Sequence, residues 1–196
     1  LILWINGTNA AKRINAHKID MVRYHHNIAG TKCRINAAGR IGDPTLALKL
    51  LLNEVEEVTE QTLSKELEAL NKERQNMTEA ALTEVEEIFS DAKNFPYILI
   101  AHNKNWHVGI LGLVAGKLAE KYGRPVIMMQ DLGDTLTASA RSPIYFNIVE
   151  ALTNFKHHLV SFGGHAQAAG FNLKKENLEK FITDINTYAE TKLANT

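Results

Sequence analysis

The chain has 196 residues, of which 45% are hydrophobic and 22% are charged, and Cys33 is its single cysteine. This composition is ordinary for a globular protein and excludes a disulfide framework, and no apolar run reaches the length of a membrane-spanning helix. Acidic and basic residues number 22 each, but residues 54 to 93 hold 12 acidic and 4 basic residues, so the remainder is basic. A basic remainder favours a phosphate-rich ligand, and charges spread over solvated faces are the alternative.

The first 30 residues carry the weakest pattern, although residues 9 to 16 favour a basic helix. His25 and His26 are adjacent, and adjacent side chains point apart on a helix or a strand, which predicts a poor metal site. The chain begins with Leu1 rather than methionine, which indicates a fragment of a longer protein. The start of the chain does not have the pattern of a signal peptide. The single thiol is compatible with a reducing, cytoplasmic compartment, or with a fold that needs no disulfide bonds.

A first candidate phosphate ligand is Arg40. Asn36 and Gly39 indicate a turn just before it, and Asp43 is placed to cap a helix that begins at Pro44. An arginine between a small-residue turn and a buried helix can grip phosphate oxygens with its planar fork. The alternative is a surface arginine or a structural salt bridge.

Residues 54 to 93 contain no proline or glycine, and their apolar positions recur at spacings of three, four and seven. This pattern predicts one long acidic amphipathic helix, or two helices in line. Such a helix is more often a spacer than a site, and no chemistry is assigned to it.

The next segment predicts a strand at 97–101, a glycine-bearing helix that ends near 122, and a strand at 126–129. Strand, helix and strand at this spacing indicate a βαβ unit with parallel pairing. His107 precedes the helix at the edge of the predicted sheet, where an α/β fold usually binds its ligand. A helix-capping histidine is the alternative.

Two polar motifs follow. Ser139, Arg141 and Ser142 end a predicted third strand at 135–140, and two hydroxyls beside one guanidinium can hold phosphate oxygens. A helix at 147–155 leads to Gly163-Gly164-His165, which is interpreted as a loop that presents backbone N–H groups and an imidazole to an anion. The alternative is a glycine turn with a solvated histidine. A strand at 170–173 and an amphipathic helix at 176–192 complete the chain.

Five segments together resemble a known family. They cover residues 34–40, 106–115, 122–127, 139–142 and 162–170. In this order they are similar to the C-terminal half of RecJ-type single-strand exonucleases of the DHH phosphoesterase superfamily. The segment that begins with Trp106-His107 resembles RecJ rather than the shorter nanoRNase relatives.

The resemblance implies a 5′-3′ exonuclease of DNA repair and recombination whose DHH domain holds two Mn²⁺ or Mg²⁺ ions. The DHH-associated C-terminal domain is implied to close over that domain and to bind single-stranded DNA. Arg40, Ser139 and Arg141 are implied to receive the 5′-terminal phosphate, and the Gly-Gly-His motif is implied to contact the substrate backbone. The expected partners are single-stranded DNA and the DHH domain of the same protein, and no membrane. The candidate substrate-binding residues are Asn36, Arg40, His107, Ser139, Arg141, Ser142, Gly163, Gly164 and His165.

One departure from the family pattern concerns the metals. The chain has no Asp-His-His sequence, and its aspartates, Asp184 among them, have no histidine partner at ligand spacing. We therefore expect no metal or cofactor in this chain and an absent catalytic domain that carries the Mn²⁺ or Mg²⁺. The chain alone is expected to bind nucleic acid without cutting it.

The predicted fold is α/β, with a mixed, mainly parallel sheet flanked by helices and preceded by the long acidic connecting helix. The predicted divisions are an N-terminal arm at 1–53, the connecting helix at 54–95 and a DHH-associated domain at 96–196. Two other functions stay open: a nanoRNase or cyclic-dinucleotide phosphodiesterase relative, and a non-catalytic nucleic-acid-binding or scaffold module. Trp106, Tyr145 and Phe162 are candidate stacking platforms for bases, but burial in the core is favoured for each.

Overall fold

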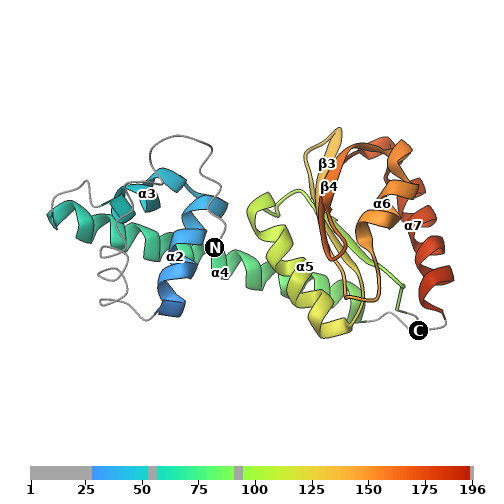
Figure 1. Ribbon diagram of the computed structural model, residues 1–196, viewed down its shortest axis with the longest axis horizontal. Coiled ribbons are helices and arrows are strands. Elements are labelled where there is room, and N and C mark those ends of the chain that lie inside the picture. The colour runs from blue at the N-terminus through green and yellow to red at the C-terminus, as the bar shows by residue number, and fades with distance from the viewer. Residues whose placement is uncertain (1–27, 53–56, 91–94, 195–196) are drawn as a thin grey trace. The chain divides into compact units, whose positions relative to one another are not determined.

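The computed structural model describes residues 28–52, 57–90 and 95–194, and the side chains of residues 28–32 and 57–60 lie outside this description. The predicted helix at 9–16 and the His25-His26 pair lie outside the described residues. The chain divides into two compact units, residues 1–75 and 76–196, and each is described by itself (Figure 1). No helix in the described ranges is long and apolar enough to cross a membrane.

The first unit contains α2 (Ile28–Ile41), α3 (Pro44–Leu52) and the first part of α4 (Glu57–Ser90). Ala38 of α2, Ala47 of α3 and Leu67 of α4 form its buried centre. Asp43 caps α3 as predicted, because its carboxylate accepts the backbone N–H of Thr45 at 2.8 Å.

The turn expected at residues 36–39 is wrong, since α2 runs without interruption to Ile41. Ala37 and Ala38 are fully buried, so packing of this small-residue face keeps the segment helical despite Gly39. The chain turns instead at Gly42, where a Cβ atom would lie 2.9 Å from Cδ1 of Leu70.

Helix α4 has 34 residues, nine of them acidic and three basic, and it is one continuous helix rather than two helices in line. Its buried positions follow steps of three, four and eleven residues, each close to a whole number of helical turns, so they lie on one stripe of an amphipathic helix. These positions are Leu63, Leu67, Thr78, Ala81, Val85 and Phe89.

The second unit is built on a five-stranded sheet in the order β1-β2-β3-β5-β4. The strands are β1 (Leu99–Asn103), β2 (Val126–Asp131), β3 (Thr135–Arg141), β4 (Leu159–His165) and β5 (Ala168–Lys174). Helix α5 (Val108–Tyr122) connects β1 to β2, and α6 (Ile148–Asn154) and the 3₁₀ turn η1 (Lys156–His158) precede β4. The 3₁₀ turn η2 (Lys175–Asn177) and α7 (Leu178–Leu193) follow β5.

The mixed sheet flanked by helices confirms the predicted fold class, but the expectation of mainly parallel pairing is wrong. Only β1 and β2 pair in parallel, through the predicted βαβ crossover. The pairs β2–β3, β3–β5 and β4–β5 are antiparallel. The physical reason is the length of the connections, since β2–β3 and β4–β5 are joined by short turns that cannot return a strand in parallel.

The two faces of this sheet differ. Figure 1 shows α5 on one side of the sheet and α6 and α7 on the other. The side of α6 and α7 holds the main core, in which Leu136, Phe171, Leu173, Phe181 and Ile185 are buried. On the opposite side α5 packs on β2 and β3, whereas β4 is exposed along its length from residue 160 onward.

Candidate nucleic-acid interface

The strand register brings several predicted site residues onto one surface. Residues directly opposite each other in antiparallel strands point to the same face of the sheet. Ser139 lies opposite Gly170, and Gly170 lies opposite Gly163, which makes one row across β3, β5 and β4. Arg141, Ala168 and His165 make the next row in the same way. We call the surface formed by these two rows the open face.

The open face lies on the α5 side of the sheet, and a third row extends it. In that row Thr137 Oγ1 donates to Asn172 Oδ1 at 2.9 Å, and Asn172 Nδ2 donates to Ser161 Oγ at 3.0 Å. These hydrogen bonds fix the amide of Asn172 between two hydroxyl groups. One border of the open face therefore consists of hydrogen-bonded polar groups.

The glycines of the open face leave backbone accessible. No atom lies within 4 Å of the position that a Cβ would take at Gly163, and the nearest atom at Gly170 is 3.6 Å away. Packing inside the protein therefore does not require glycine at either residue. The bare strip they form lets a ligand approach the main chain closely.

Gly164 has a different role. Its φ is +148°, and a Cβ there would lie 2.3 Å from the carbonyl oxygen of Ala168. This glycine is therefore needed for the close pairing of β4 and β5. The Gly-Gly-His motif is part of strand β4, not the loop that we expected, because its backbone pairs with β5 through His165.

Arg141 lies where the open face meets helix α5. Its Nη1 donates to the backbone oxygen of Ala140 at 2.7 Å and to Ser139 Oγ at 3.3 Å. A Cβ at Gly112 of α5 would lie 2.7 Å from Arg141 Nη2 and 3.0 Å from Ser139 Oγ. Gly112 therefore makes room for the guanidinium against the helix. Gly112 was not among the predicted site residues, and a glycine within a helix is the signal that could have found it, because glycine permits close approach of another group.

A hollow of about 490 Å³ lies beside Arg141. It is lined by residues of α5 and of the segment after β3, among them Gly116, Glu120 and Tyr145. The Tyr145 hydroxyl donates a hydrogen bond to the backbone oxygen of Gly123, which holds the ring at the hollow. The hollow is therefore lined by the aromatic ring of Tyr145, the guanidinium of Arg141 and the carboxylate of Glu120.

Two other candidates make internal hydrogen bonds. Ser142 is buried, and its hydroxyl donates to the backbone oxygen of Phe146 at 2.7 Å. His107 is the N-cap of α5, and its Nδ1 accepts the backbone N–H of Gly109 at 3.0 Å. His107 therefore caps the helix, as the alternative interpretation of this residue expected. By contrast, His165 is exposed, and its Nδ1 accepts the backbone N–H of Gln167 at 3.4 Å.

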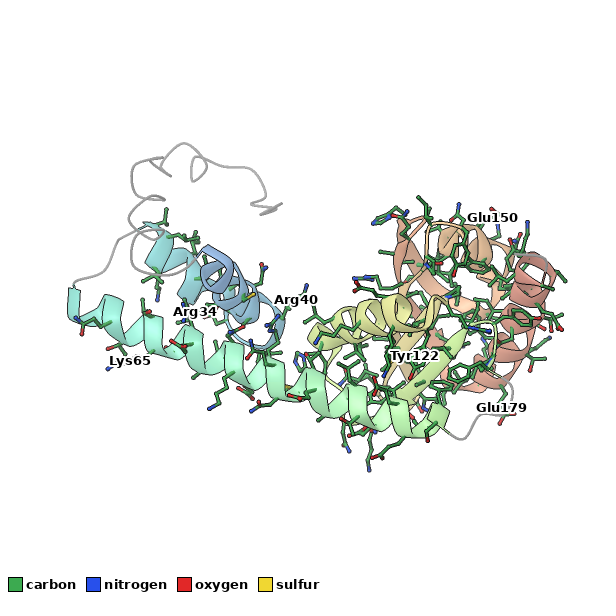
Figure 2. The ribbon with its side chains drawn as sticks, turned by 90° about the horizontal axis from the view of Figure 1, so that it is seen from below. Arg34, Arg40, Lys65, Tyr122, Glu150 and Glu179 are labelled. Carbon is green, nitrogen blue, oxygen red and sulfur yellow. The ribbon has the colours of Figure 1, made fainter. Side chains whose placement is uncertain are left out.

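Asn36 and Arg40 belong to the first unit, whereas the open face belongs to the second. Both lie on α2, where Asn36 is exposed and Arg40 is half-buried. Figure 2 shows Arg40 on this helix. Burial lowers the pKa of Arg40, and the neighbouring positive charge of Arg74 lowers it further. Two cations held near each other favour an anionic ligand, because an anion offsets both the repulsion and the lost solvation.

The candidate stacking residues have different surroundings. Trp106 is buried as expected, with 3% of its surface exposed, and its Nε1 donates to Glu84 Oε2 at 2.8 Å. Core burial was the wrong expectation for the other two rings, since Tyr145 is 52% exposed and Phe162 is 37% exposed. Both belong to surface segments, the connection after β3 and the edge strand β4.

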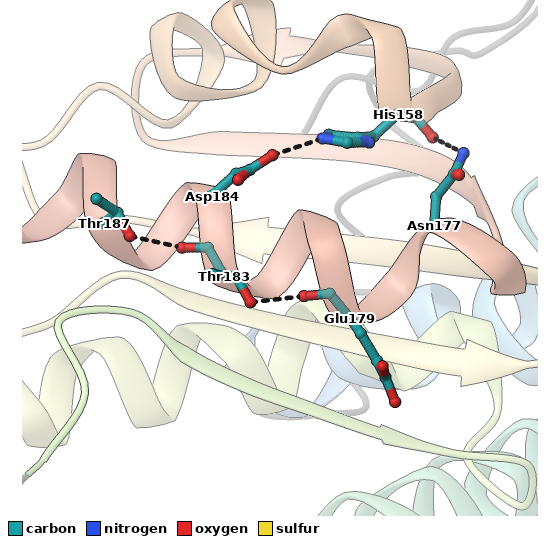
Figure 3. A network of polar contacts seen from close by, with 6 residues as sticks. All are labelled: His158, Asn177, Glu179, Thr183, Asp184 and Thr187. Carbon is teal, nitrogen blue, oxygen red and sulfur yellow. Dashed lines mark hydrogen bonds and ion pairs between the residues drawn. The ribbon is translucent and has the colours of Figure 1, made fainter.

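The expectation that no aspartate has a histidine partner is also wrong. His158 Nε2 lies 2.8 Å from Asp184 Oδ2 (Figure 3). The residues are 26 positions apart, so contact between η1 and α7 creates a pair that motif spacing does not reveal. With His157 they form the only group of three or more His, Cys, Asp or Glu in the described ranges able to hold one ion. Two imidazoles and one carboxylate do not fit the oxygen-rich coordination that Mg²⁺ requires, and one group of three ligands does not make the expected two-metal centre.

The sequence and the fold of this chain are similar to those of known proteins. Residues 94–191 match the model of a family described as the DHHA1 domain. The chain is 35% identical over 158 residues to the single-stranded-DNA-specific exonuclease RecJ of Salmonella typhimurium. That match covers 76% of this chain and 27% of the relative. The chain thus spans about a quarter of the length of the curated relatives it matches.

Two crystal structures of RecJ from Thermus thermophilus are similar in three dimensions. The complex with Mg²⁺ has a TM-score of 0.76 and 29% identity, with 92% of this chain and 30% of that chain covered. The complex with Mn²⁺ has a TM-score of 0.71 and 32% identity, with 81% of this chain and 23% of that chain covered.

Proposed function

The chain belongs to the DHHA1 domain family, and from this premise we propose that it is the nucleic-acid-binding C-terminal portion of a RecJ-like exonuclease. The proposed substrate is single-stranded DNA, which the whole enzyme digests in the 5′-3′ direction. The proposed division is an N-terminal arm at 1–53, a connecting helix at 54–95 and the DHH-associated domain at 96–196. The confirmed resemblance to RecJ supports this proposal.

The observation that carries the proposal is the shared surface of Ser139, Arg141, Gly163 and His165. These residues come from sequence segments more than 20 positions apart, yet they occupy two neighbouring rows of the open face. The guanidinium of Arg141, the hydroxyl of Ser139 and the imidazole of His165 can each interact with phosphate oxygens, and they surround glycine backbone that has no side chain. Phosphate oxygens accept hydrogen bonds from arginine and serine, and the missing side chains give the strand room to approach.

Each residue has a separate proposed task. Arg141, oriented by Ala140 and Ser139, binds the 5′-terminal phosphate with its planar fork. His165 and the backbone around Gly163 contact the next phosphate groups. Gly164 keeps β4 in position, while Ser142 and His107 support the site through the hydrogen bonds that anchor β3 and α5. Asn36 and Arg40 form a second contact region for phosphate in the first unit.

Hydrolysis is assigned to a DHH domain outside this chain. The Mn²⁺ or Mg²⁺ of that domain would supply metal-activated water, and the residues described here do not fit such a centre. The described side chains instead bind and orient the strand. The purified chain, given Mn²⁺ and an end-labelled single strand, is therefore expected to leave the strand intact. Metal-dependent digestion by this chain would contradict the assignment.

The main test is binding of a 5′-phosphorylated single strand, measured by fluorescence anisotropy against its 5′-hydroxyl version. We expect the wild-type chain to prefer the phosphorylated strand by about tenfold, since a charge-assisted hydrogen bond contributes about 1.5–3 kcal/mol. Arg141→Ala should abolish this preference. Affinity should also fall as salt rises, because phosphate contacts release counterions.

Lys180→Ala is the matched control, because Lys180 is an exposed cation on α7, on the other side of the sheet. It should retain the preference for the phosphorylated strand. Equal binding of both strands by the wild-type chain would contradict a phosphate site on this domain. Equal losses of affinity in Arg141→Ala and Lys180→Ala would show that the strand binds through general surface charge rather than at Arg141. A dinucleotide that binds more tightly than a longer strand would favour the small-substrate phosphodiesterase alternative.

A further inference from the structure

A second polar cluster lies on the α7 side of the sheet, opposite the open face. His157 and His158 belong to η1, and Asp184 belongs to α7. The two imidazole centroids are 4.0 Å apart, although adjacent side chains usually point apart. The proposed nucleic-acid interface makes no use of these three residues.

We propose that His157, His158 and Asp184 form a binding site for a divalent cation of the Zn²⁺ class. Their ligand atoms all lie within 4.8 Å of one another. Zn–N and Zn–O distances of about 2.0–2.2 Å require donor atoms roughly 3.3–3.6 Å apart around a tetrahedral ion. His158 Nε2 and Asp184 Oδ2 are 2.8 Å apart in a hydrogen bond, so an ion would replace that hydrogen bond and separate the two atoms by about 0.5–0.8 Å, and exposed His157 would supply the third ligand.

The chemistry of the donors selects the type of ion. Imidazole nitrogen suits Zn²⁺, Ni²⁺ and Cu²⁺, whereas Mg²⁺ and Ca²⁺ require mostly oxygen ligands. Three protein ligands leave a fourth tetrahedral position for water. This inference concerns a binding site and does not depend on the proposed nuclease function.

The surroundings hold His158 in place. Asn177 Nδ2 donates to the backbone oxygen of His158 at 3.1 Å, which ties η1 to the start of α7 (Figure 3). His158 is 5% exposed, and its ring lies 6.4 Å from that of Phe181. Ligands with restricted rotation lose less entropy when an ion binds.

Binding of the ion would have a structural consequence for the sheet. Strand β4 begins at Leu159, directly after His158, and carries Gly163 and His165 farther along. An ion that joins η1 to α7 would therefore clamp the start of β4 to the core. Because an ion that binds only the native state stabilises it, Zn²⁺ should raise the melting temperature of the chain.

The test is calorimetric titration of Zn²⁺ into the full 196-residue chain. Cys33 is exposed, and His25 and His26 are a second adjacent pair, so the titrated background carries Cys33→Ser, His25→Ala and His26→Ala. In this background we expect one Zn²⁺ per chain. His157→Ala and Asp184→Asn should each weaken binding at least tenfold and remove the rise in melting temperature.

His102→Ala is the matched control, because His102 is an exposed histidine on β1. It should bind Zn²⁺ as the background does. His157 is exposed, so its replacement should leave the metal-free melting temperature unchanged and separate ligand loss from unfolding. The proposal is overturned if the background chain shows no saturable Zn²⁺ binding, or if His157→Ala and Asp184→Asn bind Zn²⁺ as tightly as the background does.

Discussion

The two faces of the sheet have opposite character, although the same strands supply both. On β3, Leu136, Ala138 and Ala140 point toward α6 and α7 and are buried, whereas Ser139 and Arg141 alternate with them on the α5 side. On β5, Phe171 and Leu173 face the core, and Gly170 faces outward. Successive side chains of a strand point to opposite faces, so the residues that stabilise the core alternate with the proposed binding residues along β3 and β5. Substitutions on the open face can thus change binding while the fold stays intact.

The largest effect on stability is expected from the core face. Phe181 is fully buried and packs on Phe171, with ring centroids 5.4 Å apart. Phe181→Ala should lower the free energy of unfolding by about 3–5 kcal/mol through lost burial and a cavity. Urea denaturation followed by circular dichroism measures this loss. A loss below about 1 kcal/mol would show that the α7 side does not supply the main core.

The two adjacent glycines of β4 provide a sharper comparison. Gly164→Ala should destabilise the chain by about 2 kcal/mol or more, because φ is +148° and the added Cβ meets Ala168. Gly163→Ala should change stability by less than about 1 kcal/mol, since open space surrounds its Cβ position. The same substitution should weaken single-strand binding several-fold by covering the bare strip. Similar melting temperatures for the two variants would contradict the assigned roles.

Gly112 separates binding from stability within α5. Gly112→Ala places a methyl group 2.7 Å from Arg141 Nη2 and should displace the guanidinium. We expect most of the preference for a 5′-phosphorylated strand to be lost, a change of about tenfold or about 1.4 kcal/mol. Gly116→Ala is the matched control on the same helix, because no atom lies within 4 Å of its Cβ position. A preference retained by Gly112→Ala would exclude the role of this contact.

A polar contact on the outer surface of α6 and α7 is expected to have the smallest effect. Hydrogen bonds from Tyr188 and Lys192 lower the pKa of Glu150. A carboxylate with a lowered folded pKa stabilises the native state above its unfolded pKa, about 4.3, and this contribution is lost as pH falls through the folded value. Glu150→Gln should therefore lower the melting temperature slightly at pH 7 and less at pH 3. An equal change at both values would contradict this linkage.

The sequence predicted the helices better than the sheet. The apolar stripe of α7 and the proline-free, glycine-free run of α4 each specify a helix through a regular period. The segment from 162 to 165 has two glycines and no alternation, so its place in β4 depends on pairing with β5. The antiparallel pairing of β2 with β3 and of β4 with β5 was missed as well, because the sequence did not make evident that short turns join these strands.

The candidate site was likewise predictable where a local motif marks a residue, and not where the site depends on packing. Ser139, Arg141 and Gly163 could be proposed as site residues because each belongs to a recognisable motif. Their common surface follows from strand register, which no local pattern contains. The contact between His158 and Asp184 joins residues 26 positions apart and depends entirely on how α7 packs. Exposure of Tyr145 and Phe162 was missed because aromatic residues are usually buried, and both lie on surface segments.

The most direct test of the open face is titration of the ¹⁵N-labelled chain with a 5′-phosphorylated single strand, followed by amide NMR spectra. The account predicts the largest shifts at Ser139, Gly163, His165 and Gly170, together with the side-chain N–H signal of Arg141. Amides of α7 should shift little, because that helix lies on the opposite side of the sheet. Shifts concentrated on α7, or none on the open face at saturation, would contradict the assignment of nucleic-acid binding to this surface.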